Sequence, residues 1–308
     1  MKYVIGIDGG GTKSVINIAD LNGKIISRGL GGPTNIKSAS LDEVHTVLKE
    51  LMENAVSKSG LLIDDCASVC IGTAGVHELK GESDVAALIK SIGIKGNVIV
   101  TNDAEIVLAA ESKDVEGVVL IAGTGSIAYG IDRYRKRYRS GGWGHILGDE
   151  GSGYYIGLEG IKAALKCYDG REPYTELLPM LEQEMGVLNV EGMVDRIYKK
   201  DLKKSEIAYY SKTVNKAFEN GDKKAEEILQ NSSSELFMLV DAVIKAMKYE
   251  NVSTTVVVNG SVIVKNNFIF NSFTNLAKDK YPLINIKKLS KEAAYGASRI
   301  ALKALKIQ

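Results

Sequence analysis

The chain has 308 residues, more than one hydrophobic core usually holds, so two domains are expected. Hydrophobic residues make up 45% and charged residues 25%, as in ordinary globular proteins. The 39 basic residues nearly balance the 38 acidic ones, and a net charge of +1 gives no overall attraction to nucleic acid or to an anionic membrane. Three cysteines predict no disulfide framework, and since no apolar leader or membrane-length run is visible, we expect a cytoplasmic protein.

The first motif follows a short apolar strand over 3–8 that ends on Asp8. A glycine turn with a hydroxyl and an ammonium group comes next, at Gly9, Gly10, Gly11, Thr12 and Lys13. A strand over 15–19 follows the turn, whereas a P-loop or a dinucleotide fingerprint would begin a helix there. The amides of this glycine hairpin can wrap phosphate oxygens, and Asp8 is placed to hold a hydrated Mg²⁺. A bare glycine turn with an exposed Asp is the alternative for this motif alone.

The next elements alternate between helices and strands. A capping box at residues 40–43 begins an amphipathic helix. A strand over 67–72, a helix over 83–92 and a strand over 97–101 predict parallel pairing. Asp103 follows the last of these strands, and open α/β sheets bind ligands at the carboxyl ends of their strands. Asp103 is therefore a catalytic candidate, although a helix cap would look the same in the sequence.

A second round begins with a strand over 118–122. The glycine turn 123–126 leads into another strand rather than a helix, which repeats the plan of residues 8–19 and predicts a duplicated fold that grips one phosphate chain from both sides. The basic run 133–139 has interleaved tyrosines, but its position favours the far end of a hairpin over an RNA-binding surface. A weaker hypothesis is that Arg139 attracts an anionic substrate.

Residues 141–153 concentrate six glycines, the single tryptophan, a histidine and two adjacent carboxylates. Glycine allows positive φ and a close backbone approach at a cost in conformational entropy, so this segment predicts a bound polar ligand. We expect backbone amides and Asp149 as hydrogen-bond partners and Trp143 as an apolar wall. A tight connection between a hairpin and a helix is the alternative.

The rest of the chain is mostly helical up to residue 250, with an apolar stripe over 225–247. A β-branched strand over 254–258 then ends in Asn259, Gly260 and Ser261, a turn that can cover an adenosine. The elements expected after it are a helix to Ala277, a strand over 282–286 and a last helix over 291–305.

Together these motifs resemble the N-acetylglucosamine kinase family, in the BadF/BadG/BcrA/BcrD group of the actin, hexokinase and Hsp70 ATPase superfamily. They fall in the family's order across nearly the whole chain, and residues 141–152 are the most specific part. Bacterial kinases that also phosphorylate N-acetylmuramic acid, and glucosamine kinases, are similar too. The resemblance implies an α/β fold with two ribonuclease H-like, actin/hexokinase-type domains flanking a nucleotide and sugar cleft. The implied domains are 1–113, joined by the C-terminal helix 291–308, and 114–290 with a helical insertion.

The same resemblance implies an ATP-dependent kinase that phosphorylates the 6-hydroxyl of N-acetylglucosamine or N-acetylmuramic acid in cell-wall amino-sugar salvage. It also implies that the protein is a homodimer. Asp103 would be the general base, and Mg²⁺ would lie near Asp8, held through water. The implied sugar contacts are Asn35, Asp103, Gly142, Trp143 and Asp149. The expected nucleotide contacts are Gly10, Gly11, Thr12, Lys13, Gly123, Thr124, Gly125, Gly221, Gly260 and Ser261.

Other functions stay open. A glucosamine kinase would share the motifs. An ATPase that activates a partner enzyme through an iron–sulfur cluster needs cysteine ligands, and Cys167 alone follows the second glycine turn. A sugar-sensing regulator would need an added DNA-binding module, and a nucleic-acid binder would rest on residues 133–139. ATP and a small amino sugar are the expected partners, rather than nucleic acid or a membrane.

Overall fold

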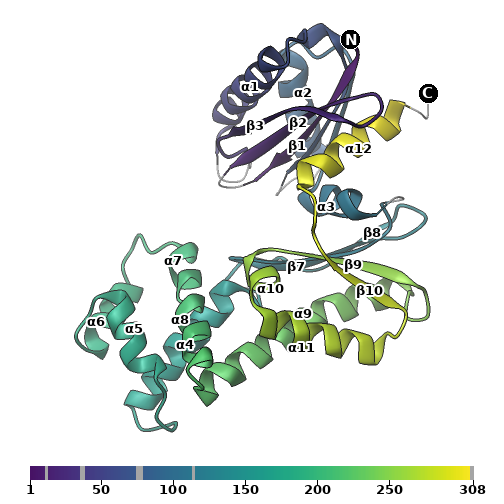
Figure 1. The fold of residues 1–308 in the computed structure, drawn as a ribbon. Helices are drawn as coiled ribbons and strands as arrows, with labels where there is room; N and C mark the ends of the chain where they lie inside the picture. Colours follow the sequence, from purple (N-terminus) through teal and green to yellow (C-terminus); the bar gives the residue numbers. More distant parts are fainter. Residues whose placement is uncertain (11–12, 35–38, 74–78, 113–114, 306–308) are drawn as a thin grey trace. The chain divides into compact units, whose positions relative to one another are not determined.

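The computed structural model describes residues 1–10, 13–34, 39–73, 79–112 and 115–305 (Figure 1). The chain divides into two compact units, unit 1 with residues 1–116 and 289–308 and unit 2 with residues 117–288. The chain therefore leaves unit 1 once and returns to it with its last helix. Each unit holds a five-stranded sheet with helices packed on it, which confirms the predicted α/β class.

The sheet of unit 1 has the strand order β3-β2-β1-β4-β5. Its strands are β1 (Tyr3–Gly9), β2 (Ser14–Asp20), β3 (Ile25–Gly31), β4 (Cys66–Thr73) and β5 (Asn97–Thr101). β1, β2 and β3 are antiparallel neighbours, whereas β4 pairs with β1 and β5 in parallel. The helices are α1 (Leu41–Lys58), the short 3₁₀ helix η1 (Ile63–Asp65), α2 (Leu79–Ser91), α3 (Asp103–Glu111) and α12 (Ala293–Leu305).

Helices cover both faces of this sheet. Ile5 and Ile7 of β1 pack in one hydrophobic cluster with Leu48 of α1 and with α2. Gly6 points to the other face, where an added Cβ would collide with the backbone nitrogen of Ser298 in α12. The last helix therefore lies directly on the central strand, and only glycine at position 6 lets it do so.

The sequence signal for α1 is confirmed in detail. Ser40 Oγ accepts the Glu43 N–H at 3.3 Å, and the Glu43 carboxylate accepts the Ser40 N–H at 2.8 Å, so both halves of the capping box are present. The residues that α1 buries lie at helical spacing and are Val44, Leu48, Leu51, Met52, Ala55 and Val56.

Unit 2 repeats the sheet of unit 1. Its strand order is β8-β7-β6-β9-β10, which corresponds strand for strand to β3-β2-β1-β4-β5. Each neighbouring pair also has the same parallel or antiparallel direction as its counterpart, which confirms the predicted repeat. The strands are β6 (Gly117–Ala122), β7 (Ser126–Ile131), β8 (Arg137–Gly141), β9 (Thr254–Asn259) and β10 (Ile284–Lys288). The helices are α4 (Gly153–Tyr168), α5 (Leu177–Met185), α6 (Val190–Ile197), α7 (Lys204–Tyr209), α8 (Ser211–Glu219), α9 (Lys223–Met247), α10 (Ser261–Lys265) and α11 (Asn267–Lys280).

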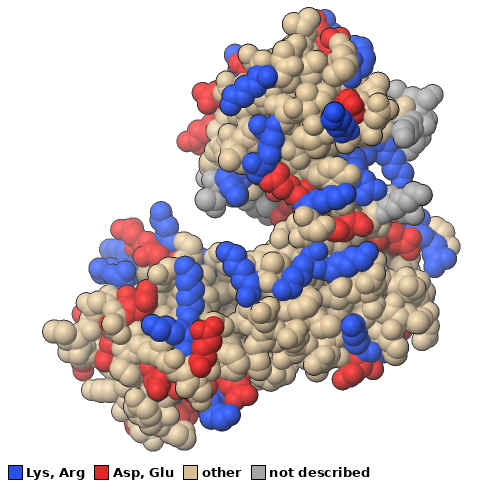
Figure 2. All heavy atoms as spheres, in the orientation of Figure 1, with Lys and Arg blue, Asp and Glu red and all other residues tan. Residues whose placement is uncertain are grey.

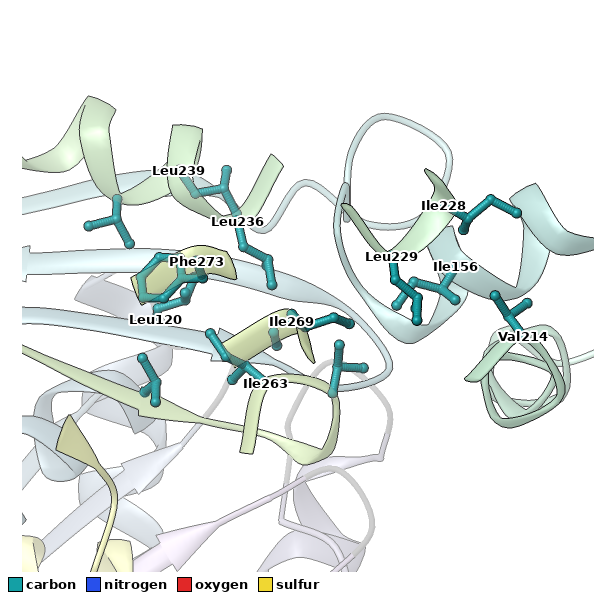
Figure 3. Close-up of a cluster of buried hydrophobic side chains, with 14 of the residues drawn as sticks. Leu120, Ile156, Val214, Ile228, Leu229, Leu236, Leu239, Ile263, Ile269 and Phe273 are labelled. Atoms are coloured by element: carbon teal, nitrogen blue, oxygen red, sulfur yellow. The ribbon is translucent and has the colours of Figure 1, made fainter. Parts of the chain in front are cut away.

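One continuous core joins the sheet of unit 2 to its helices (Figure 3). Leu120 of β6 packs with Phe273 of α11, and the same cluster continues through Leu229 of α9 to Ile156 of α4 and Val214 of α8. Burying each such side chain contributes roughly 1.5–3 kcal/mol. The helices inserted between β8 and β9 therefore share one hydrophobic core with the sheet of unit 2.

Several boundaries differ from the prediction. The single helix expected to run to Ala277 is wrong, because Asn266 is extended (φ −91°, ψ 106°) and separates α10 from α11. Its Oδ1 accepts the Ile269 N–H at 3.0 Å, so the residue that breaks one helix caps the next. β10 begins at Ile284 rather than at residue 282, since Pro282 lies in a turn closed by the Ile284 N–H. α2 begins four residues earlier than expected.

Candidate functional site

Two carboxylates lie near strand ends in unit 1. Asp8 is the second-last residue of β1, and Asp103 is the first residue of α3, just after β5. The N-cap of α3 is Asn102, whose Oδ1 accepts the Glu105 N–H at 2.7 Å. Asp103 Oδ1 accepts the N–H of the adjacent Ala104 at 3.0 Å. Asn102 therefore performs the capping that was the alternative explanation for Asp103.

The pKa of Asp8 is raised to about 6, first by burial and then by the negative charge of Asp103, while Lys13 opposes the shift. A divalent cation beside Asp8 would stabilise the charged carboxylate, and it would thereby offset both its burial and its repulsion by Asp103. Mg²⁺ is commonly bound by one or two carboxylates and completes its shell with waters and phosphate oxygens, so these residues fit it. Among the described residues, no group of three or more His, Cys, Asp and Glu side chains could hold a metal ion alone.

Gly9 and Gly10, at the start of the first glycine motif, are closely packed. An added Cβ at Gly9 would lie 2.5 Å from Thr34 Oγ1, and one at Gly10 would lie 2.7 Å from the Lys13 carbonyl oxygen. Gly10 donates its N–H to that carbonyl, and its own carbonyl accepts the Thr34 N–H, both at 3.1 Å. The Lys13 side chain is exposed. The predicted contacts that fall outside the described residues are Gly11, Thr12 and Asn35.

In unit 2, two helix starts meet the second glycine turn. The Gly153 N–H donates to the Gly123 carbonyl at 2.8 Å and the Tyr154 N–H to the Thr124 carbonyl at 3.3 Å, so α4 begins against this turn. Gly260 (φ +98°) precedes α10, and an added Cβ there would collide with the Ala122 backbone. The structure thus brings the predicted glycine turns at 123–125 and 260–261 together.

These turns line a pocket of about 360 Å³. Its apolar side consists of Ile156, Leu229, Val262 and Ile269. Its polar groups come from Gly123, Thr124, Ser205, Tyr209, Ser211, Lys212, Asn215, Ser261, Lys265 and Asn266. An apolar slot beside glycine amides, hydroxyls and two ammonium groups suits a nucleotide, with the base in the slot and the phosphates toward the glycine turn.

Asp149 organises the segment between β8 and α4. It is only 3% exposed and has φ +66°. One carboxylate oxygen accepts the Ser126 N–H at 3.0 Å, and the other accepts from Lys204 Nζ at 2.5 Å. Gly125 makes room for this carboxylate, since an added Cβ would lie 2.6 Å from Oδ1. The residue predicted as a sugar contact therefore also ties its segment to the second glycine turn and to α7.

Trp143 stands at the surface of unit 2, with 65% of its area exposed. Arg139 covers one face of the indole, its guanidinium carbon 3.9 Å from the ring centroid. The chain turns between Arg139 and Trp143 at Gly141 (φ +72°) and Gly142 (φ +71°). An added Cβ at Gly142 would lie 2.6 Å from Ile127 Cδ1. The glycine pair therefore presents the tryptophan to solvent.

The model of the BadF/BadG/BcrA/BcrD ATPase family matches residues 5–301. The chain belongs to this family. The chain is 40% identical over 301 residues to the N-acetylmuramic acid/N-acetylglucosamine kinase of Clostridium acetobutylicum, covering 98% of each. It is 29% identical over 318 residues to the N-acetyl-D-glucosamine kinase of Dictyostelium discoideum, covering 99% of each.

A solved structure of a Chromobacterium violaceum protein, assigned as an N-acetylglucosamine kinase, shares the fold. It superposes with a TM-score of 0.77 at 19% identity, over 98% of this chain and 99% of the other. Within the part of the chain that the structure describes, no helix is long and apolar enough to cross a membrane. On the face shown in Figure 2, basic and acidic side chains are interspersed over both units of this BadF/BadG/BcrA/BcrD ATPase.

Some pocket residues of this family member were missed by sequence reasoning. Lys212 and Asn215 lie on α8, in the region predicted only as mostly helical, and no local motif marks them. Lys265 was detectable, because it lies four residues after Ser261 and so on the same helix face. Gly221 lies between α8 and α9 with φ +92° and is not among the described residues that line the pocket.

Proposed function

We propose that this chain is an ATP-dependent kinase that phosphorylates the 6-hydroxyl of an N-acetylated amino sugar, N-acetylglucosamine or N-acetylmuramic acid, in cell-wall amino-sugar salvage. The 40% identity to the Clostridium acetobutylicum kinase carries the most weight, because it extends over 98% of both chains. The pocket of unit 2 and the strand-end carboxylates of unit 1 support the proposal, because they hold groups of the kinds that this reaction requires.

Each unit contributes one set of groups. ATP would occupy the pocket of unit 2, with its phosphates near the turns at 123–125 and 260–261 and near Lys212 and Lys265. In unit 1, the turn at 10–13 would hold further phosphate oxygens. The proposed sugar contacts of unit 2 are Gly142, Trp143 and Asp149, and those of unit 1 are Asp103 and Asn35.

Phosphoryl transfer depends mainly on positioning and on neutralising charge. Asp103 would accept a hydrogen bond from the sugar 6-hydroxyl and orient its oxygen toward the γ-phosphorus. As that P–O bond forms and the bond to the leaving ADP oxygen breaks, the hydroxyl proton passes to the Asp103 carboxylate. A carboxylate is a weak base toward an alcohol, so this proton transfer comes late. Asp8 would hold Mg²⁺ through water, and the bound ion would offset phosphate charge.

The cysteines speak against an ATPase activator that carries an iron–sulfur cluster. Cys66 and Cys70 are 2% and 0% exposed in β4, and Cys167 lies in α4 of the other unit. Burial raises the pKa of Cys66 to about 12 and raises the pKa of Cys70 as well. Iron–sulfur clusters need several accessible thiolates. The purified protein should be colourless and free of iron.

A homodimeric assembly in the cytoplasm belongs to the same proposal and is supported by the resemblance to the amino-sugar kinases. Light scattering after size-exclusion chromatography should give about twice the 33.2 kDa chain mass. A mass of one chain at micromolar concentration would remove the homodimer without touching the kinase proposal.

The decisive experiment measures ADP release from Mg-ATP with N-acetylglucosamine, N-acetylmuramic acid, glucosamine and glucose, and with no sugar. Turnover limited to the N-acetylated sugars is the expected result. Turnover with glucosamine alone would replace the proposal by a glucosamine kinase, and hydrolysis independent of sugar would replace it by the activator.

A further inference from the structure

Arg139 and Trp143 form the tightest cation–π pair among the described residues. The guanidinium carbon lies 3.9 Å from the indole centroid, whereas the other pairs lie between 4.2 and 5.8 Å. At 3.9 Å the planar guanidinium is in contact with the ring face. Arg139 is only partly exposed, and β8 holds it opposite Tyr129 of β7. The cation is therefore fixed beside the tryptophan rather than free in solvent.

The stack uses the face of the guanidinium and leaves its edge available. Apart from this contact, no ion pair or hydrogen bond joins the Arg139 guanidinium to another described residue. Asp149, the buried carboxylate of the same segment, is bonded to Lys204. The N–H donors of a guanidinium lie in its plane, so a stacked arginine points them outward around the rim of the ring. An anion beside Trp143 would meet a set of unused donors.

The rest of the basic run differs from Arg139. Lys136 lies over Tyr138 at 5.2 Å, and Arg133 lies over Tyr249 at 5.8 Å. Lys136 follows the turn at the far end of the β7–β8 hairpin, and its N–H donates to Asp132 in that turn. Arg139 contacts Trp143 of the proposed sugar-binding segment, whereas the rings beneath Lys136 and Arg133 lie outside it.

We propose that Arg139 recognises a carboxylate on the sugar and thereby decides whether the enzyme accepts N-acetylmuramic acid as well as N-acetylglucosamine. Because this role rests on the proposed function, it requires a sugar bound at Trp143. N-acetylmuramic acid carries a lactyl ether at O3 that ends in a carboxylate, and N-acetylglucosamine has a hydroxyl there. A sugar against the indole brings this arm to the rim of the ring, where a guanidinium can bind a carboxylate with two parallel N–H···O bonds.

The first test compares kcat and KM for wild type, Arg139→Gln, Arg139→Lys and Arg137→Gln. The three substrates are N-acetylglucosamine, N-acetylmuramic acid and the methyl ester of N-acetylmuramic acid, which keeps the arm but removes its charge. Arg139→Gln should raise KM for the acid about 10- to 100-fold more than for the ester or N-acetylglucosamine. Arg139→Lys should give an intermediate rise in KM for the acid, because an ammonium keeps the positive charge but cannot donate two parallel hydrogen bonds to one carboxylate. Arg137→Gln removes one charge from the same strand and should leave the acid-to-ester ratio unchanged.

A second readout avoids turnover. Trp143 is the single tryptophan of the chain, so its fluorescence reports directly on this site. Without nucleotide, wild type should bind the acid more tightly than the ester, and the two dissociation constants should converge in Arg139→Gln. Far-ultraviolet circular dichroism and thermal melting of each variant confirm that it is folded.

The outcomes separate this role from the kinase proposal itself. An equal loss for all three sugars in Arg139→Gln would mean that Arg139 only supports Trp143, which overturns the inference. Wild-type turnover of N-acetylglucosamine with none of N-acetylmuramic acid overturns it too, while the kinase proposal stands. No phosphorylation of any amino sugar removes both.

Discussion

The two carboxylates of unit 1 follow different strands and interact through their charges. Asp103 lies in the first turn of α3 and accepts the Ala104 N–H, and Asn102 caps the helix. Burial and the negative charge of Asp103 raise the pKa of Asp8 to about 6. In the proposed function Asp103 is the general base, and the raised pKa of Asp8 fits a position beside a bound cation.

Replacing the proposed base should separate binding from turnover. Asp103→Asn keeps the shape of the side chain and should fold and bind sugar, with kcat lower by about 10² to 10⁴ because general-base help is lost. Steady-state ADP release gives kcat, and Trp143 fluorescence gives sugar affinity. Wild-type-like turnover in this variant would remove Asp103 from the role.

The raised pKa of Asp8 should appear in the pH dependence of stability. The folded-state pKa of about 6 exceeds the unfolded value, so between pH 4 and 6 the folded state binds more protons. The contribution of Asp8 to the free energy of unfolding is therefore fully present below pH 4, and it is lost as the pH rises through 6. Without Mg²⁺, Asp8→Asn should exceed wild type in unfolding free energy by up to about 3 kcal/mol at pH 7 and by little at pH 4.

Urea unfolding in EDTA at a series of pH values measures this difference. Adding Mg²⁺ should stabilise wild type more than Asp8→Asn if Asp8 holds the ion. The same unfolding free energy for both proteins at pH 4 and at pH 7 would contradict the raised pKa.

At the scale of elements, the start of α10 depends on one glycine. Gly260→Ala places a Cβ against the Ala122 backbone at φ +98°, so it should lose stability by about 3 kcal/mol or more and weaken ATP binding. Gly186→Ala is the matched control, because Gly186 also has positive φ (+68°) but no atom within 4 Å of an added Cβ. The control should lose only about 1 kcal/mol, the cost of the backbone conformation. Equal losses in urea unfolding would show that the contact with β6 is irrelevant.

A second prediction concerns the ion pair between Lys204 of α7 and Asp149 in the segment before α4. Lys204→Met leaves the Asp149 carboxylate buried without its cation and should cost about 2 to 4 kcal/mol. Lys162→Met removes a cation from an exposed pair with Glu159 and should cost less than about 1 kcal/mol. Proteolysis should also cleave residues 142–152 faster in Lys204→Met only. Matching cleavage rates in the two variants would show that Lys204 does not order the segment.

Local sequence signals predicted most helices and strands, but they did not predict contacts between elements that are distant in the sequence. The capping box of α1 and the apolar stripe of α9 act within one helix, so periodicity reveals them. Asn266 breaks a helix because its side chain competes for a backbone N–H, and the sequence allows both outcomes there. Lys204 meets Asp149 across 55 residues, and no spacing rule connects them. For the same reason, the lysine and asparagine of α8 in the pocket could not be found.

At the scale of the whole molecule, the chain closes unit 1 with its last segment. α12 buries Ala294, Ala297 and Ala301 and lies on β1 next to Gly6. A chain that ends at residue 288 should therefore lose the cooperative unfolding of unit 1, since one face of its sheet would be uncovered. Hydrogen exchange of the β1 amides measures this loss, and a chain that ends at residue 305 is the control. Full protection of β1 in the shorter chain would contradict the packing role of α12.

The three free cysteines divide unevenly between the units, with Cys66 and Cys70 buried in one and Cys167 half-buried in the other. A maleimide should label native protein at one thiol only, which would mark α4 without any engineering. Two more thiols would react once unit 1 opens. Counting labels by mass spectrometry along a denaturant series would thus distinguish the opening of unit 1 from that of unit 2 in a single unmodified chain.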